Sequence, residues 1–143
     1  MNNRKGIGLI TYHSAYNYGS VMQTYGTIKT LNKLGYEVET IDYRTPSQTL
    51  WYQTDFSSKK GLRDMLLNFG FKLHSKERKE RARKFEDFIS SNLCPSSSRY
   101  TKWNEIRFID NYEILISGSD QIWNFDCGEF RSEPIEAIYP YFF

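Results

Sequence analysis

The chain has 143 residues, of which 39% are hydrophobic and 25% charged, and 19 basic residues nearly balance 17 acidic ones to leave a net charge of +2. This balance gives no reason to expect a nucleic-acid partner, and the lack of an 18-residue apolar run and of a secretory signal in the sequence predicts a cytoplasmic chain without a membrane span. The length suits one domain with its own core and is too short for two full-sized domains.

The first 43 residues have the pattern of a strand, a helix and a second strand. Residues 6–12, "GIGLITY", are apolar and β-favouring, which indicates a buried strand. Apolar positions then recur every three or four residues over residues 19–34, which predicts a helix that ends at Gly35. "YEVETIDY", residues 36–43, predicts the second strand. Such a unit places its strands parallel in one sheet with a right-handed crossover.

The middle of the chain is predicted to be a long loop followed by helices. Residues 45–60 contain Pro46 and many polar side chains, and loops of this length are usually functional or mobile. Residues 61–73 have a helical pattern, and a further helix begins with Ser75 as its N-cap. The apolar positions of this further helix lie on one face at helical spacing: Ala82, Phe85, Phe88 and Ile89.

The start of that further helix is rich in charge. The segment from Lys76 to Lys84 holds six cations and two anions. It could bind a phosphate or another polyanion, but interleaved opposite charges at helical spacing are more typical of a solvent-exposed face. His74, between the two helical segments, is predicted to lie at the surface.

The last third of the chain begins with residues 94–99, "CPSSSR", which are predicted to be a linker. Residues 101–109 predict a short helix, and residues 112–117, "YEILIS", predict a third strand. Three strands with flanking helices predict an α/β fold built on a Rossmann-like parallel sheet. Cys94 and Cys127 have neither CxxC spacing nor a nearby histidine, so we expect no metal site and no disulfide framework.

Polar side chains follow each predicted strand. The carboxyl ends of parallel strands share one edge, and ligands of open α/β sheets bind at that edge. We therefore expect the loop from His13 to Gly19, the segment from Asp42 to Arg44 and residues 117–124 to meet. Aromatic residues make up 17% of the chain, and in such loops they either stack on sugars or bases or belong to the core.

The loop after the first strand has features of a ligand site. Gly19 stands where the first helix begins, and the free N–H groups there favour a phosphate or a carboxylate. The loop is neither a G-x-G-x-x-G nor a Walker A sequence. Asn17 either caps the helix or contacts a ligand, with Tyr18 beside it. His13 suits general acid or base catalysis near neutral pH, or else has a structural role.

The loop after the third predicted strand, "GSDQIWN", is residues 118–124. Gly118 permits a tight turn, while Ser119 and Gln121 supply hydrogen bonds. Asp120 either accepts a proton from a sugar hydroxyl or caps a turn that buries the Ile-Trp pair after it. Arg44, at the end of the second strand, either pairs with a carboxylate or phosphate or is an exposed cation.

Together the two loops resemble a known family. The segments "GLITYHSAYNYGSVMQTYGTIKTLNKLGYEVETIDYR" and "ILISGSDQIWN" resemble the polysaccharide pyruvyl transferases, in which a His…Asn-Tyr-Gly loop opens the first helix. A Gly-Ser-Asp-Gln-(Ile/Val)-Trp-Asn loop follows a later strand in that family. The resemblance covers roughly residues 6–44 and 114–124, and the middle helices resemble the family only in character.

The resemblance implies transfer of the carboxyvinyl group of phosphoenolpyruvate to a sugar hydroxyl, ending in a pyruvate ketal on a surface polysaccharide or its precursor. It implies no cofactor and no metal, with phosphoenolpyruvate as the donor substrate. The implied fold is the N-terminal half of a two-domain transferase of the GT-B type. Such chemistry needs an acid for the enol carbon, a base for the attacking hydroxyl and stabilisation of the anionic groups.

The resemblance also implies site residues. Asp120 is the candidate base and His13 the candidate acid. The residues implied to bind substrate are Asn17, Tyr18, Gly19, Arg44, Gly118, Ser119, Gln121, Trp123 and Asn124.

Members of this family are longer and carry a second Rossmann-like half. We therefore expect residues 1–143 to form a truncated N-terminal domain with a helical insertion at about residues 61–93. Residues 130–143 would begin a missing continuation or fold back on the domain's own core. The alternative functions are an inactive sugar- or phosphate-binding half-domain that needs a second half or a partner chain, and a generic Rossmann-like domain. A narrow sheet with exposed edges also predicts self-association.

Overall fold

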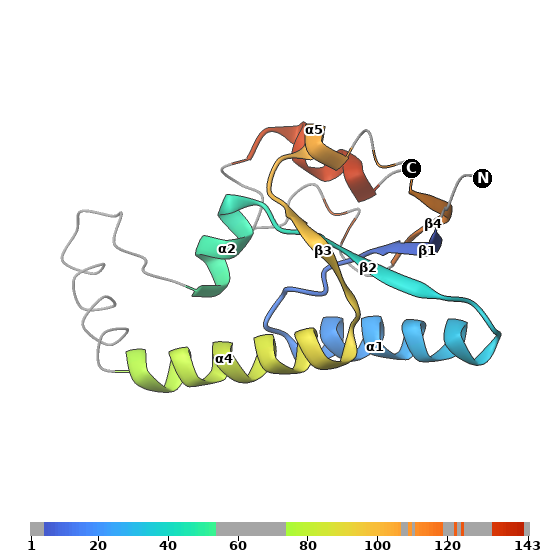
Figure 1. Ribbon diagram of the computed structural model, residues 1–143. Coiled ribbons are helices and arrows are strands. Elements are labelled where there is room, and N and C mark those ends of the chain that lie inside the picture. The colour runs from blue at the N-terminus through green and yellow to red at the C-terminus, as the bar shows by residue number, and fades with distance from the viewer. Residues whose placement is uncertain are drawn as a thin grey trace.

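A parallel sheet organises the part of the chain that the computed structural model describes, which is residues 5–53, 74–106, 109, 111–118, 122, 124 and 133–141. Its four strands are β1 (Lys5–Ile10), β2 (Val38–Tyr43), β3 (Pro95–Tyr100) and β4 (Tyr112–Ser117). They lie in the order β3-β2-β1-β4, and each neighbouring pair is parallel. Helices flank the sheet (Figure 1). The predicted α/β, Rossmann-like fold is confirmed.

Strand β3 corrects the prediction of a linker at residues 94–99. β3 pairs with β2, with Thr40 opposite Pro95 and Tyr43 opposite Tyr100. The strand lies at an edge of the sheet and its side chains are exposed or half-buried, so it needs no apolar run. Polar groups hold it in place, because the Asp42 backbone N–H donates to the Ser96 hydroxyl at 3.0 Å.

Two long helices cover one face of the sheet: α1 (Tyr18–Lys33) and α4 (Ser75–Asn92) (Figure 1). The predicted apolar positions of α4 do face the sheet, with Phe85 and Ile89 buried. Alternate residues of β1 point to this side, as the two-residue period of a strand requires. The core on this face consists of Ile7, Leu9, Tyr16, Val21, Ile28, Val38, Phe85, Ile89 and Leu93.

The other face carries the short helix α5 (Trp103–Ile106) and a 3₁₀ helix, η3 (Ile135–Tyr141). Its core consists of Ile10, Tyr12, Ala15, Ile41, Tyr43, Ile106, Ile122 and Ala137. The Tyr43 hydroxyl donates a hydrogen bond to the Ala137 carbonyl at 2.8 Å, which ties η3 to β2. The described part of the C-terminal segment therefore packs on the domain's own core. That residues 130–143 begin a further element stays a prediction.

Helix α2 (Pro46–Gln53) corrects the prediction that residues 45–60 are entirely loop. Proline suits the first turn of a helix, where its missing N–H has no partner to lose. Thr45 and Gln48 form a reciprocal cap: the Gln48 N–H donates to the Thr45 hydroxyl at 3.2 Å, and the Thr45 N–H donates to the Gln48 side chain at 3.0 Å. Residues 54–60, and the helix predicted over 61–73, lie outside the described residues.

The start of α4 also differs by one residue from the prediction. Ser75 is the first helical residue, and His74 takes the N-cap position without a side-chain capping bond. The reason is that the His74 carbonyl already accepts the Arg78 N–H at 3.1 Å, so the helical hydrogen bonds begin there. His74 is exposed, as predicted, and pairs with Glu77 at 2.6 Å.

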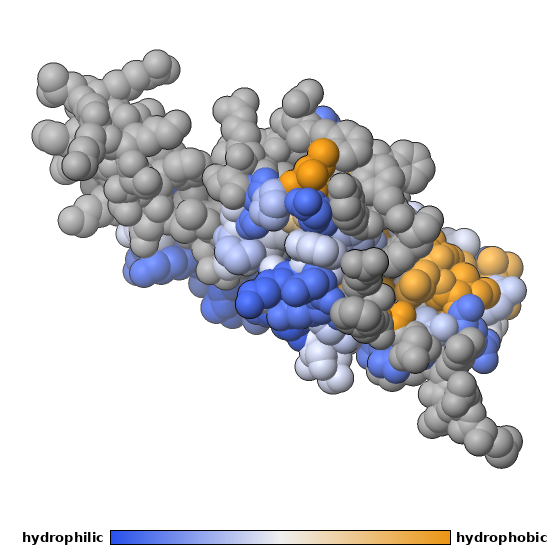
Figure 2. Space-filling view, turned by 90° about the horizontal axis from the view of Figure 1, so that it is seen from above, coloured by the Kyte–Doolittle hydropathy of each residue, from blue (hydrophilic) through white to orange (hydrophobic). Residues whose placement is uncertain are grey.

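Among the coloured residues in Figure 2, polar ones lie toward the middle of the view, and most of the hydrophobic ones gather toward the right-hand end, where β1 and β4 lie in Figure 1. Ile114 of β4 and Leu34 after α1 are among the exposed apolar side chains. No helix within the described ranges combines the length and the apolar character needed to cross a bilayer.

Candidate functional site

The carboxyl ends of β1 and β4 meet, as the sequence predicts for the two loops. The Gly118 N–H donates to the Ile10 carbonyl at 2.7 Å. A Cβ atom at Gly118 would lie 2.7 Å from Cβ and Oγ1 of Thr11, so only glycine lets the two strand ends approach this closely. In the order β3-β2-β1-β4 the connections change direction between β1 and β4, which is where open α/β sheets bind ligands.

His13 lies in the loop after β1 and is completely buried. Its Nδ1 is 3.1 Å from the Thr11 carbonyl oxygen, and its Nε2 is 2.9 Å from Oδ1 of Asp42 at the end of β2. A carbonyl oxygen and a carboxylate oxygen are both hydrogen-bond acceptors, so each ring nitrogen of His13 lies beside an acceptor. The contact with Asp42 confirms that the ends of β1 and β2 converge.

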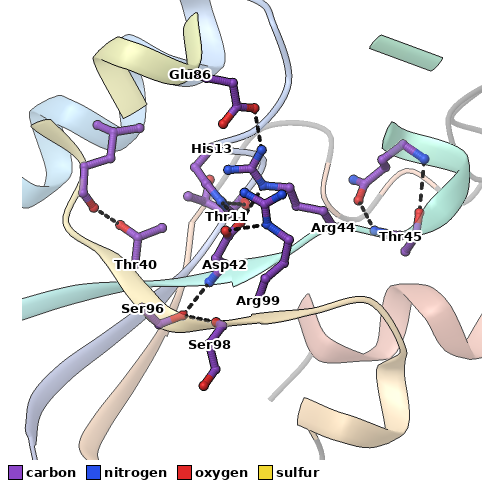
Figure 3. Close-up of polar contacts among 12 residues, drawn as sticks. Thr11, His13, Thr40, Asp42, Arg44, Thr45, Glu86, Ser96, Ser98 and Arg99 are labelled. Carbon is purple, nitrogen blue, oxygen red and sulfur yellow. Dashed lines mark hydrogen bonds and ion pairs between the residues drawn. The ribbon is translucent and has the colours of Figure 1, made fainter. Parts of the chain in front are cut away.

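Asp42 is the centre of an ionic cluster that we call the Asp42 cluster: His13, Asp42, Arg44, Glu86 and Arg99 (Figure 3). The side chains of His13, Asp42 and Arg44 are buried, whereas those of Glu86 and Arg99 are partly exposed. Arg44 Nε contacts Oδ1 of Asp42 at 2.5 Å, and Arg99 Nε contacts Oδ2 at 3.0 Å. Burial by itself would raise the pKa of Asp42, but the His13 hydrogen bond and the Arg44 charge outweigh it and hold the pKa far below its usual value. Asp42 is therefore ionised.

The sequence left open whether Arg44 pairs with an anion or is an exposed cation. The Arg44 side chain is only 7% exposed and bridges two carboxylates, so it is not an exposed cation. Besides Asp42 it contacts Oε1 of Glu86 on α4 at 2.5 Å. Burial opposes its charge, yet Asp42 and Glu86 raise its pKa. The Tyr16 hydroxyl donates to the same Glu86 oxygen at 2.7 Å. These bonds connect the loop after β1, the end of β2 and α4.

The start of α1 holds three of the predicted binding residues. The Asn17 side chain accepts the Gly19 N–H at 2.8 Å, so it caps the helix. Tyr18 is 72% exposed, and its ring lies 5.0 Å from the ring of Phe85 on α4. The start of α1 is therefore open to a ligand on the side that faces α4.

A pocket of about 540 Å³ lies at this place. Its described lining comes from the loop after β1 and the start of α1 (Tyr16, Asn17, Tyr18), from α2 (Tyr52) and from α4 (Arg78, Arg81, Ala82). A second, water-sized recess of about 20 Å³ lies on the other side of Tyr16 and Tyr52 and reaches Arg44 and Arg99. Tyr16 and Tyr52 thus line both the pocket and the recess that reaches the Asp42 cluster.

Four predicted site residues lie outside the described residues: Ser119, Asp120, Gln121 and Trp123. Their roles remain predictions. Ile122 between them is fully buried, as the capping interpretation of Asp120 expects, and Asn124 is exposed.

Sequence reasoning missed Glu86 and Arg99 as members of the Asp42 cluster. Glu86 follows the buried Phe85 and precedes the buried Ile89 by three positions, so helical spacing places it at the border of the apolar face. That position was a usable signal. Arg99 gave no signal, because its role depends on residues 94–99 being a strand.

The described residues contain no group of three or more His, Cys, Asp or Glu side chains arranged to hold a metal ion.

A parallel sheet with helices on both faces defines an α/β protein with a Rossmann-like fold. A family model described as polysaccharide pyruvyl transferase matches residues 17–142 of the 143 residues. The chain belongs to this polysaccharide pyruvyl transferase family. His13 lies outside the matched range. Comparison with curated proteins and with solved structures gave no match.

Proposed function

We propose that the chain takes part in the transfer of a pyruvyl group from phosphoenolpyruvate to hydroxyls of a saccharide acceptor. The observation that carries this proposal is the family match over residues 17–142. The charged residues at the carboxyl ends of β1 and β2 support it, because the reaction needs charged groups at the ligand-binding edge of the sheet.

The reaction asks for balanced proton transfers. Protonation of C3 of phosphoenolpyruvate makes C2 electrophilic, and a sugar hydroxyl attacks C2 as its proton leaves. The bond between C2 and the phosphate oxygen then breaks, and a second hydroxyl closes the ketal. The two hydroxyl protons balance the proton gained by C3 and the proton taken up by the phosphate that leaves. Each well-placed acid or base contributes about 10²–10⁴-fold to such a rate.

Asp120 is the proposed base and His13 the proposed acid. In the described conformation both nitrogens of His13 are engaged by Thr11 and Asp42, so proton donation to a substrate requires the Nε2 bond to Asp42 to open. A positioning role, in which His13 holds Asp42 and the loop after β1, requires no such opening. The two roles predict different pH profiles.

The complete site, in this proposal, is a cleft between this domain and a second Rossmann-like half of GT-B type, supplied by a longer chain or by a partner chain. Positioning of both substrates and stabilisation of the leaving phosphate depend on both walls of such a cleft. Turnover by this chain alone would then be low, and addition of the second half would raise it.

The test is incubation of the chain with phosphoenolpyruvate and a panel of galactose- and mannose-containing saccharides. Phosphate release and the methyl resonance of a pyruvate ketal are the two readouts. Asp120→Asn should abolish ketal formation without changing the melting temperature. His13→Gln keeps a hydrogen-bond donor toward Asp42 but cannot act as an acid, so it distinguishes the acid role of His13 from its positioning role. Loss of activity with an altered pH profile supports the acid role, and an unchanged profile supports the positioning role.

The second candidate function is a sugar- or phosphate-binding half-domain without catalysis. The observation that favours it is that His13 and Arg44 are buried and bonded within the chain, while the pocket of about 540 Å³ lies at the start of α1 and has neither residue in its described lining. Saturable binding of saccharides without phosphate release, in the presence of every acceptor tested, would contradict the transferase proposal and support this one.

A further inference from the structure

The lining of the pocket beside the start of α1 includes residues of α2 and α4 to which the proposed reaction assigns no role. Its volume of about 540 Å³ lies within the range of about 300–1,000 Å³ that is usual for small-molecule sites. Residues from three separate elements line it: Tyr16 and Tyr18 near the start of α1, Tyr52 of α2, and Arg78 and Arg81 of α4. A hollow formed by three elements has a defined shape.

The charge of the described lining is positive. Arg78 and Arg81 lie one turn apart on α4, and the lining residues that the structure describes include no carboxylate. Arg81 is held in place, because its Nη2 donates to the Tyr16 carbonyl at 2.8 Å and its guanidinium lies 5.5 Å from the centre of the Phe85 ring. Two guanidinium groups at this spacing suit a phosphate.

The aromatic part of the lining forms a rigid platform. The Tyr16 ring stacks on Phe85, with centroids 5.6 Å apart and planes inclined by 18°, and it contacts Tyr52 at 5.7 Å. Tyr18, which contacts Phe85 from the start of α1, leaves most of its ring uncovered. Exposed aromatic faces with hydroxyls at their edges suit a sugar ring, which has an apolar face and a polar rim.

We propose that this pocket binds the phosphate-bearing part of the saccharide acceptor, with Arg78 and Arg81 on the phosphate and Tyr18 against the sugar ring. This inference rests on the proposed function, because it assigns the acceptor of that reaction to a sugar phosphate. The donor, phosphoenolpyruvate, has no ring that would use the aromatic platform.

The pocket also lies beside the carboxyl edge of the sheet. Tyr16 lines it with its ring, and the hydroxyl of the same residue bonds to Glu86 of the Asp42 cluster.

The test is calorimetric titration of the full chain with four probes: glucose 1-phosphate, inorganic phosphate, glucose and phosphoenolpyruvate. Glucose 1-phosphate should bind more tightly than the other three. Arg78→Gln should lower the affinity for glucose 1-phosphate about tenfold, which is the effect of losing one charge-assisted hydrogen bond. Tyr18→Ala should lower the affinity for glucose 1-phosphate and leave the affinity for inorganic phosphate unchanged.

Arg83→Gln is the matched control. Arg83 lies on the same helix and carries the same charge, but it is exposed, is absent from the described pocket lining and pairs with Glu80 and Asp87. Its substitution should change the affinity less than twofold. Equal weakening by Arg78→Gln and Arg83→Gln would show that only the general charge of α4 attracts the probe, and would overturn the inference.

The same variants separate this inference from the proposed function. If the chain forms the ketal and Arg78→Gln does not change the KM of the acceptor, the assignment of the pocket to the acceptor is contradicted. The transferase proposal is then unaffected. Tight, Arg78-dependent binding of glucose 1-phosphate without any ketal formation would support the pocket and contradict the transferase proposal. Phosphoenolpyruvate binding that equals glucose 1-phosphate binding would overturn the assignment of the pocket to the acceptor.

Discussion

Two arginines in this chain each bridge two carboxylates, and they differ mainly in burial. Arg44 contacts Asp42 and Glu86 at 2.5 Å each, and Arg83 contacts Glu80 and Asp87 at 2.8 and 2.7 Å. The Arg44 side chain is 7% exposed, whereas that of Arg83 is 60% exposed. Similar distances thus occur in two very different surroundings.

The difference teaches that geometry alone does not set the strength of an ion pair. Water and salt screen the Arg83 pairs, and ordering long exposed side chains costs entropy. In the Asp42 cluster, removal of one partner leaves a buried charge without compensation, which costs far more than the pair itself contributes. The buried arginine therefore fixes the geometry of the site, while the exposed one belongs to the solvated face of α4.

The largest effect should come from Asp42→Asn. The amide cannot carry the negative charge that faces Arg44 and Arg99, and its NH₂ group opposes the donors around it. We expect a loss of about 3–5 kcal/mol in the free energy of unfolding, measured by urea denaturation.

The double variant Asp42→Asn/Arg44→Met is the control for this prediction. It removes a positive charge together with the negative one. Its loss in the free energy of unfolding should therefore be smaller than the sum of the losses of the two single variants. Strict additivity of the two changes would contradict the coupling that the structure shows.

The next effect is the pH dependence of stability. The pKa of Asp42 is lower in the folded chain than its unfolded value of about 3.9, so its contribution to stability is complete above about pH 5 and is lost progressively as the pH falls below that. Between about pH 5 and pH 2 the wild type should lose more stability than Asp42→Asn. Parallel curves for the two proteins would show that Asp42 is not specially stabilised as a carboxylate.

Glu86→Gln should have an intermediate effect, because the Glu86 side chain is 34% exposed. The substitution weakens one contact to Arg44 and one to Tyr16, and water can replace part of the lost hydrogen bonding. We expect a destabilisation of about 1–2 kcal/mol by chemical denaturation. A loss as large as that of Asp42→Asn would mean that Glu86, and not Asp42, is the centre of the cluster.

Arg83→Gln should have the smallest effect. Its pairs on α4 are exposed, so the denaturation midpoint should be indistinguishable from that of the wild type, at low and at high salt. A clear shift that disappears in 1 M NaCl would show that exposed pairs on α4 do contribute to stability.

The parts of the fold that the sequence predicts are those with a strong periodic pattern. The strands at residues 6–12, 36–43 and 112–117 have β-favouring apolar patterns, and α1 and the apolar face of α4 have helical spacing. Strand β3 has no such pattern, because an edge strand with exposed side chains needs only backbone partners. Helix α2 had a readable signal in its Thr-Pro-Ser-Gln start, whose reciprocal cap and first-turn proline mark a helix.

The site was predictable to the level of which strand ends meet. The rule that ligands bind at the carboxyl edge placed His13 beside Asp42, and the structure has them in contact. The rule could not show that Arg44 turns inward to Glu86, because that contact joins residues 42 positions apart on different elements. Long-range ionic partners depend on how the helices pack, which local patterns do not contain.

The arrangement of β1 between β2 and β4 has a consequence for how the chain folds. Ile7 pairs with Val38 on one side and with Ile114, about a hundred positions later, on the other. During synthesis β1, α1 and β2 can assemble first, but the second edge of β1 stays open until β4 leaves the ribosome. Closing such distant pairs is slow, so folding should be limited by the arrival of β4, and until then the open edge of β1 can pair with another chain.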